Sequence, residues 1–319
     1  MLVRFGYVAM STVVPNASPS KTMTAASFNK LADREAAIRK LERIAEENLN
    51  NTLRLLRHNR AHDIHLYRFS SKLIPLLGHE MLAGWDPFPF LSNSFAEVGA
   101  YARENDMRCS FHPDHFTVIS TPRQDVLEKS YDDLDRHVRM LEHMGLDERA
   151  KCNIHIGGSY KDKEKTMERF IRQFSAMPDR IQVRLTLEND DKTFNAAETL
   201  FACEQLKVPM VLDIHHHAVN SAGESAQELW PRIRETWDGQ RVPPKIHASS
   251  PKSEKDPRGH ADYLHTPDLL EFLRSVAADT PALDVMIEAK MKDGALFRLM
   301  EDLQKETNVE IVDQASASI

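Results

Sequence analysis

Histidine and carboxylate side chains recur in this chain at the ends of short apolar segments. Residues 208–217, Val-Pro-Met-Val-Leu-Asp-Ile-His-His-His, have the length and the bounding proline of a buried strand, and they end in one carboxylate and three imidazoles. Such a mixture of oxygen and nitrogen donors suits divalent Zn, Mn or Fe. Five further strand-like segments carry a ligand-type residue at or near their ends: His112, His155, Glu188, His247 and Glu288. These are too many ligands for one ion, so they indicate a polynuclear metal centre and therefore an enzyme.

The apolar segments alternate with amphipathic stretches along almost the whole chain. We expect strands at residues 2–9, 63–69, 108–113, 152–157, 183–189, 208–214, 244–249 and 283–289, each followed by a helical pattern. Eight such units predict a single α/β domain, a (β/α)8 TIM barrel of residues 1–310, with residues 311–319 as a frayed tail. A doubly wound open sheet is the alternative, but it has edge strands and usually fewer units. In a barrel, functional side chains lie at the C-terminal ends of the strands, as the candidate ligands do.

Strand alternation indicates which candidates share a face of the sheet, because successive side chains point to opposite sides. Lys245 and His247 are two residues apart and therefore point to the same side. Strict alternation pairs Asp213 with His215, whereas a turn directly after the strand brings His216 beside Asp213 instead. The spacing leaves both arrangements open, and it makes at least one of the three consecutive histidines a bystander.

The composition is that of an ordinary globular protein, with 319 residues, 41% hydrophobic and 28% charged. The net charge of −7 argues at face value against nucleic acid, but a metal pocket concentrates acids that the ions neutralise. Three cysteines without CxxC spacing, and no recognisable signal peptide or membrane span, predict a cytoplasmic protein without a membrane partner. The absence of a GxGxxG motif and of a P-loop argues against a nucleotide cofactor. We expect a monomer.

Several short motifs, taken in order, resemble those of the UV damage endonucleases. The resemblance runs from about residue 2 to Glu288 and rests on Phe-Gly-Tyr7, Tyr-Arg-Phe-Ser-Ser71, Phe-His112-Pro-Asp-His-Phe116, Asn-Ile-His155-Ile-Gly-Gly, Leu-Glu188-Asn-Asp, Leu-Asp213-Ile-His-His216 and Pro-Lys245-Ile-His247-Ala-Ser-Ser-Pro. It implies a TIM barrel related in architecture to endonuclease IV. It also implies hydrolysis of the DNA strand immediately 5′ of UV photoproducts, which are cyclobutane pyrimidine dimers and 6-4 photoproducts.

The resemblance also implies a metal centre of two or three divalent ions, commonly Mn²⁺, with Zn²⁺ and Mg²⁺ as the alternatives. Its ligands would be His79, His112, His155, Glu188, Asp213, His216, His247 and Glu288. This assignment prefers His216 to its two neighbours. It adds Lys245 and His260 to Glu188 as catalytic residues.

DNA contacts are expected in the loops at the same end of the barrel. The resemblance assigns lesion reading to Tyr7 and to the pair His115 and Phe116. The family usually has Gln where this chain has His115, and Asn where it has Ser11, so the lesion range is open. A second group lies in the long loop after the seventh strand, where basic side chains can contact phosphates: Lys252, Lys255 and Arg258.

Two rival functions fit parts of the pattern. A metal-dependent sugar isomerase or epimerase on the same barrel would also use a divalent site, to polarise a carbonyl. A non-enzymatic metal-binding scaffold is the other alternative, but it does not explain why ligands converge at so many strand ends. Cleavage of damaged DNA separates all three.

Overall fold

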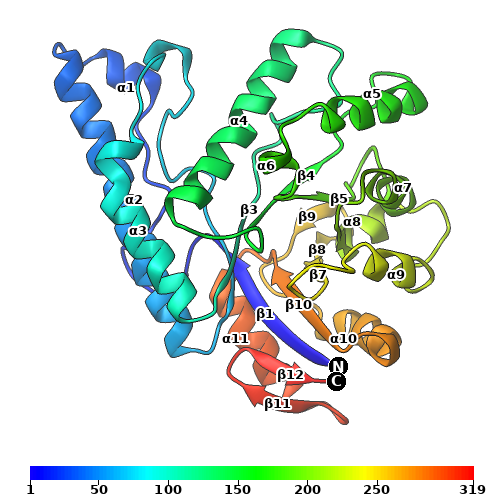
Figure 1. Cartoon of the computed structure of the whole chain (residues 1–319). Coiled ribbons are helices and arrows are strands. Elements are labelled where there is room, and N and C mark those ends of the chain that lie inside the picture. The colour runs from blue at the N-terminus through cyan, green and yellow to red at the C-terminus, as the bar shows by residue number, and fades with distance from the viewer.

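Eight parallel strands close into a barrel in the computed structural model, which describes residues 1–319 (Figure 1). The strands are β1 (Leu2–Val8), β2 (Leu66–Arg68), β3 (Arg108–Phe111), β4 (Lys151–His155), β5 (Leu185–Glu188), β6 (Met210–Asp213), β7 (Lys245–Ala248) and β10 (Ala282–Ile287). Neighbours in this order pair in parallel, and β1 also pairs with β10, with Leu2 opposite Ala282 and Tyr7 opposite Ile287. This last pairing closes the barrel and excludes the open sheet, so the predicted (β/α)8 fold is confirmed.

Helices surround the barrel because each presents one apolar stripe to the strands. In α4, for example, Leu134, Val138 and Leu141 are buried, and they belong to one continuous core of 70 buried residues. The helices are α1 (Ala25–Asn29), α2 (Arg34–Ala61), α3 (Phe88–Glu104), α4 (Gln124–His143), α5 (Lys163–Ser175), α6 (Asp179–Gln182), α7 (Ala196–Leu206), α8 (Ile214–Val219), α9 (Ala226–Glu235), α10 (Thr266–Val276) and α11 (Lys292–Leu303), with short 3-10 turns η1 (Glu80–Leu82) and η2 (Ala277–Asp279). None of them is long and apolar enough to cross a lipid bilayer.

The first two strands approach each other more closely than a side chain would allow. A Cβ atom at Gly6 would lie 2.1 Å from the backbone oxygen of Leu66, so only glycine fits this position of β1. Gly6 pairs with Leu66 in the register that brings Val8 opposite Arg68. The close contact therefore helps to set the register of the two strands whose C-terminal ends lie at the candidate site.

The C-terminal segment is a packed part of the domain, and the predicted frayed tail is wrong. Residues 310–318 form an antiparallel hairpin of β11 (Glu310–Asp313) and β12 (Ser316–Ser318), and β12 pairs with the N-terminal half of β1. Ala315, Ser316 and Ala317 are buried. The two chain ends also meet, since the Ile319 amide donates to the Met1 carbonyl at 2.9 Å (Figure 1). The Ala and Ser residues of β12 have no strong strand propensity. They form a strand because the edge of β1 offers unpaired backbone groups with which they can pair.

A buried ion cluster lies inside the barrel at the N-terminal ends of β1, β3 and β10. Asp284 has no exposed surface. Its carboxylate accepts hydrogen bonds from Arg4 Nε at 2.8 Å and from Arg108 Nη1 at 2.6 Å. Burial of a carboxylate is costly unless cations and hydrogen bonds compensate it, and two arginines do so here.

Candidate metal centre

Two groups of potential ligands meet at the C-terminal end of the barrel. The first consists of His112, His155 and Glu188, and the second consists of Glu188, Asp213, His247 and Glu288. Within each group, one ligand atom of every residue lies within 4.8 Å of those of the others. Glu188 belongs to both groups. The six residues come from β4, β5, β6 and β7 and from the segments directly after β3 and β10, as barrel geometry requires of a shared site.

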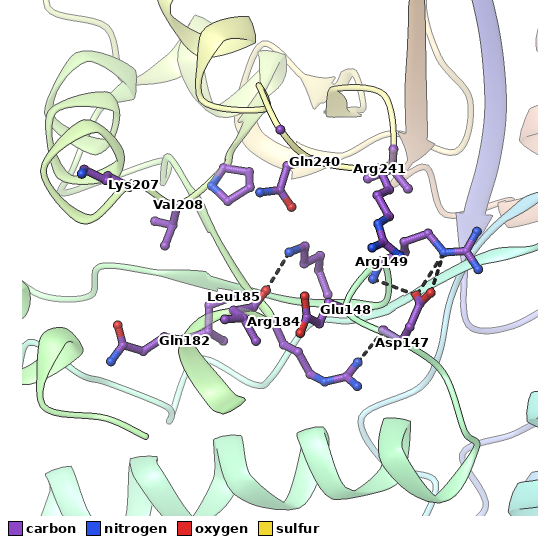
Figure 2. Close-up of a pocket in the computed structure, with 15 residues that line it drawn as sticks. Asp147, Glu148, Arg149, Gln182, Arg184, Leu185, Lys207, Val208, Gln240 and Arg241 are labelled. Atoms are coloured by element: carbon purple, nitrogen blue, oxygen red, sulfur yellow. Dashed lines mark hydrogen bonds and ion pairs between the residues drawn. The ribbon is translucent and has the colours of Figure 1, made fainter. Parts of the chain in front are cut away.

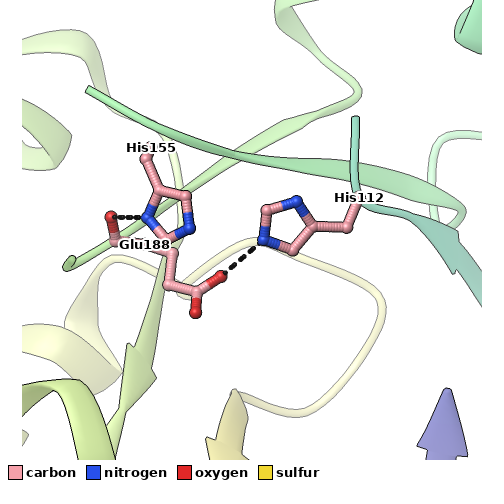
Figure 3. A group of neighbouring side chains, drawn as sticks. All are labelled: His112, His155 and Glu188. Atoms are coloured by element: carbon pink, nitrogen blue, oxygen red, sulfur yellow. Dashed lines mark hydrogen bonds and ion pairs between the residues drawn. The ribbon is translucent and has the colours of Figure 1, made fainter. Parts of the chain in front are cut away.

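The imidazoles of the site are oriented by backbone carbonyl groups. Nδ1 of His155 lies 3.2 Å from the Glu188 carbonyl, that of His216 lies 3.0 Å from the Asn189 carbonyl, and that of His112 lies 3.0 Å from the Pro113 carbonyl. Figure 3 shows His112 and His155 on either side of Glu188. Because a carbonyl can only accept, Nδ1 carries the proton and Nε2 is left with a free lone pair. Metal-binding histidines have this arrangement.

His112 and Glu188 form a contact that a cation would explain. Burial lowers the pKa of His112, so the imidazole is neutral and has one N–H, which the Pro113 carbonyl accepts. Its Nε2 nevertheless lies 3.1 Å from Glu188 Oε2. Two lone pairs therefore face each other, at a spacing that suits two ligands each ~2.0–2.2 Å from one ion.

Short helix α8 resolves the choice among the three consecutive histidines. It begins directly after β6, with the Asp213 carboxylate accepting from the His216 amide at 2.8 Å, and this turn brings His216 Nδ1 within 3.7 Å of Asp213 Oδ2. Both nitrogens of His215 are engaged elsewhere, with Ser249 Oγ at 2.6 Å and the Pro257 carbonyl at 2.7 Å. Neither His216 nor His217 belongs to the two compact ligand groups, but His216 Nδ1 lies 3.6 Å from a Glu188 oxygen, whereas His217 has no carboxylate oxygen within 4.0 Å.

Glu188 and Glu288 are ionised although both are buried. Burial raises the pKa of Glu188, but the positive fields of His247 and His155 outweigh this effect and hold that pKa well below its ordinary value. Burial also raises the pKa of Glu288, and there Arg68 and His247 lower it well below its ordinary value. Both carboxylates are therefore ionised, which is the state that binds metal.

Polar atoms of the cluster also remain without partners among the protein groups. Asp213 Oδ2 is buried and accepts no hydrogen bond, and neither nitrogen of His247 has a well-aligned partner. His247 Nδ1 lies 3.1 Å from a Glu188 oxygen and 3.0 Å from a Glu288 oxygen. Unsatisfied buried polar groups of this kind are costly in the protein alone. The donor set of imidazoles and carboxylates fits divalent Mn or Zn.

The predicted catalytic residues Lys245 and His260 lie at different depths of the site. Lys245 lies on the same face of β7 as His247, two residues toward the N-terminal end, and only 2% of it is exposed. Burial and the neighbouring Arg108 and Arg68 lower the pKa of Lys245 to about 7. His260 lies at the rim, where its Nδ1 lies 2.8 Å from the Glu288 carbonyl.

His79 is not brought to the ligands, contrary to expectation. It caps the 3-10 turn η1, where its Nδ1 accepts from the Met81 amide at 3.3 Å, and it belongs to neither ligand group.

Arg68 and Asn153 are site residues that the sequence analysis missed. Arg68, at the end of β2, donates from Nη1 to Glu288, and Asn153 donates from Nδ2 to Glu188. Both could have been found by the alternation rule, since Asn153 precedes His155 by two residues and Arg68 ends a strand. Neither is an ordinary metal ligand, so the ligand pattern of the strand ends gave no signal for them.

The predicted DNA-reading residues fall into two classes. Tyr7 has no exposed surface, and its hydroxyl donates to Asn59 Oδ1 at 2.7 Å, contrary to the exposure expected of a residue that probes the lesion. His115 and Phe116 lie in the exposed loop after β3, with ring centroids 4.1 Å apart, and Phe116 is 75% exposed. Alternation accounts for the difference, because Tyr7 points from β1 toward Asn59 of α2, on the face opposite to Arg4 inside the barrel, whereas Phe116 lies beyond a strand end.

The basic loop after β7 is a two-stranded hairpin of β8 (Pro251–Ser253) and β9 (Asp256–His260). Lys252 and Lys255 are exposed on it, and Arg258 lies 3.7 Å from Asp191. A cavity of about 410 Å³ extends from Arg258 and His260 to His155 and His216. A second cavity, of about 480 Å³, contains Glu188 and Glu288 and reaches His115. The ligands therefore lie in open concave space flanked by both predicted DNA-contacting loops.

Fold and site together define a TIM-barrel protein with a candidate metal centre at the C-terminal face of its strands. The family model for UV-endonuclease UvdE matches residues 3–317, and the chain belongs to that family. It is 44% identical over 317 residues to the UV DNA damage endonuclease of Halalkalibacterium halodurans, covering 99% of this chain and 98% of that protein. It is 40% identical to the protein of the same name from Bacillus cereus, over 95% of each chain.

Solved structures agree with this assignment. A crystal structure described as SacUVDE superposes with a TM-score of 0.83 at 28% identity, covering 95% of this chain and all of that one. Endonuclease IV from Thermus thermophilus superposes with a TM-score of 0.56 at 12% identity, over 95% of this chain and all of that one, and shows a shared fold alone.

Proposed function

We propose that this protein is a repair endonuclease that cleaves the DNA strand immediately 5′ of UV photoproducts by metal-dependent hydrolysis. The observation that carries the proposal is the convergence of two ligand groups on Glu188 in a chain of the UV-endonuclease UvdE family. The relatives named UV DNA damage endonuclease support the same substrate. We further propose that it acts as a monomer in the cytoplasm.

The proposed ligands are the imidazoles and carboxylates that converge at the C-terminal end of the barrel: His112, His155, Glu188, Asp213, His216, His247 and Glu288. Two or three divalent ions held there, of which we favour Mn²⁺, supply Lewis acidity toward water and toward the scissile phosphate. The backbone carbonyls that accept from the imidazole Nδ1 groups keep each Nε2 directed for binding. Arg68 adds a fixed positive charge beside Glu288, where it also attracts a phosphodiester.

Lys245 and His260 have proposed roles in catalysis. Lys245 is buried beneath the metal ligands. Its protonation therefore changes the electrostatic field at Glu188, and Lys245 does not contact the phosphate groups of the DNA outside the pocket. Nδ1 of His260 donates a hydrogen bond to the Glu288 carbonyl. Its Nε2 is therefore free to exchange a proton with the cleaved strand.

One assay tests the function directly. A duplex oligonucleotide with a single cyclobutane dimer is incubated with the protein and Mn²⁺, and the products are sized on a sequencing gel. We expect a single nick immediately 5′ of the dimer, absent from undamaged duplex and from a reaction containing a chelator. A damaged duplex that stays intact with Mn²⁺, Zn²⁺ and Mg²⁺ would contradict the proposal.

Phe116→Ala tests lesion reading. The exposed ring can stack on a base at the distorted step, and such stacking contributes about 1–3 kcal/mol per base, so we expect the rate of nicking to fall roughly tenfold or more. Metal content, measured by mass spectrometry, is expected to stay unchanged. Phe201→Ala is the control, because Phe201 is also exposed but lies on α7. Loss of metal from Phe116→Ala would show a structural role instead.

A further inference from the structure

A large cavity lies at the opposite end of the barrel from the metal centre. Its volume is about 630 Å³, and it is formed by the segments that precede β4, β5, β6 and β7 (Figure 2). Lys151, the first residue of β4, lines it, whereas His155, the last residue of that strand, belongs to the metal centre. Four steps of a strand span about 13 Å, so the two sites are separated by the length of the barrel. Bottom-face residues of TIM barrels usually serve stability, so a cavity here requires its own explanation.

The charge of this cavity is opposite to that of the chain. Its lining contains five basic side chains and two acidic ones, Asp147 and Glu148, although the chain as a whole carries −7. The only ion pairs formed by these basic residues are those of Arg149, with Asp147 at 3.0 Å and Asp106 at 3.7 Å. The other four have no carboxylate oxygen within 4.0 Å: Lys151, Arg184, Lys207 and Arg241.

Two of the unpaired cations are buried. Lys151 is 4% exposed and donates from Nζ to the Val183 carbonyl at 2.7 Å. Arg184 is 7% exposed and donates to the carbonyls of Asp147 and Leu146, at 2.6 and 2.8 Å. These carbonyls satisfy hydrogen bonds but do not neutralise charge. Buried cations are normally paired, and the two acidic residues of the lining do not balance its five basic ones, so the cavity keeps a net positive charge that an anion from solution could balance.

The cationic surface continues into an adjoining cavity of about 270 Å³, which shares Arg149 and Arg241 with the first. Arg108 lines this second cavity and is 7% exposed. Its Nη1 binds Asp284, but its Nη2 is buried without a hydrogen-bond partner. A donor on a buried guanidinium group is therefore also unsatisfied at this face.

We propose that the cavity at the N-terminal face of the barrel binds a small phosphate-bearing anion. Guanidinium groups recognise phosphate through paired N–H donors, and Figure 2 shows Arg149 and Arg241 together on one side of the cavity with Lys207 on the other. The volume is in the range of small-molecule sites and exceeds what a single phosphate needs. A concave site of this size fits a small phosphorylated molecule rather than a duplex. The site is independent of the proposed nuclease activity.

The test uses two exposed cations whose loss leaves the core intact. Binding of AMP and of inorganic pyrophosphate to the full chain is measured separately by calorimetry, at an ionic strength of about 0.15 M. We expect at least one of them to bind, and the dissociation constant to rise about tenfold or more in the double variant Lys207→Gln/Arg241→Gln. Lys40→Gln/Arg172→Gln is the matched control, because Lys40 and Arg172 are exposed, unpaired and outside both cavities.

Binding that stays equally tight in both double variants would show that the anion binds elsewhere and would overturn the proposal. So would the absence of binding by either probe. Nicking of damaged DNA by the Lys207→Gln/Arg241→Gln variant is expected to equal that of the unmodified protein. If nicking falls while anion binding persists, this face contacts DNA instead, and the proposal is wrong.

A second measurement reports on Lys151 itself. Burial and the positive charges of Arg108 and Arg184 lower the pKa of Lys151 to about 8, against the opposing effect of Glu148 and Asp147. A bound anion favours the protonated ammonium, so binding at about pH 8 is expected to take up protons from the buffer. Calorimetry in two buffers of different ionisation enthalpy measures this uptake. Binding without proton uptake would remove Lys151 from the site.

Discussion

Glu188→Gln abolishes nicking of photoproduct-containing DNA, with an expected loss of about 1000-fold or more. Glu188 is the one residue common to both ligand groups, and it faces His112, His247 and His216 at 3.1, 3.1 and 3.6 Å. Glutamine keeps the shape of the side chain but removes the negative charge that would balance the bound ions. Several kcal/mol of transition-state stabilisation depend on such charge, and each ~1.4 kcal/mol is a factor of ten in rate.

Metal content distinguishes this explanation from a folding defect. We expect at least two ions per chain in the unmodified protein and fewer in Glu188→Gln, with an unchanged circular dichroism spectrum. Glu301→Gln is the control, since Glu301 is an exposed glutamate of α11 without an ion pair, and it is expected to retain full activity. Activity of Glu188→Gln within tenfold of normal would contradict the shared-ligand model.

Asp284→Asn is expected to destabilise the fold by about 3–5 kcal/mol, which is the usual cost of removing one partner from a buried ion pair. The carboxylate is the only acidic partner of Arg108, whose side chain is buried inside the barrel. Burial already lowers the pKa of Arg108, and Asp284 opposes that effect, so its loss leaves a charge without compensation. Urea denaturation followed by circular dichroism gives the change in unfolding free energy.

Asp268→Asn provides the comparison for this stability measurement. Asp268 pairs with His265 at 2.9 Å, but both side chains are more than half exposed, and such surface pairs contribute about 0–1 kcal/mol. Asp284 belongs to neither ligand group, so metal content of Asp284→Asn is expected to be normal at temperatures where it is folded. A change in stability no larger than that of Asp268→Asn would show that the two arginines are stabilised by other groups.

Most of the barrel was predictable because its strands are buried on both faces. Such strands appear as continuous apolar runs, and each of the eight predicted runs contains an observed strand or overlaps it within a residue. The ligands at Glu188, His247 and Glu288 were predictable for the same reason, since a charged or ionisable residue ending an apolar run is conspicuous. The family motifs added the preference for His216.

Other features depended on contacts between distant segments. Nothing local in the small residues 315–318 predicts a strand, because β12 is stabilised by pairing with β1, which lies at the other end of the chain. Tyr7 and Phe116 are both aromatic residues in recognisable motifs, yet one is buried against Asn59 and the other is 75% exposed.

The sequence by itself therefore determined the class of fold and the ligand types at the strand ends, since both follow from the order of apolar and polar residues along single strands. Only the tertiary structure decided that the ligands divide into two groups sharing Glu188, that His79 stays outside them, and that unpaired cations gather at the opposite face. Each of these depends on distances across the barrel. Closure of β1 on β10 sets those distances, and no single segment encodes that closure.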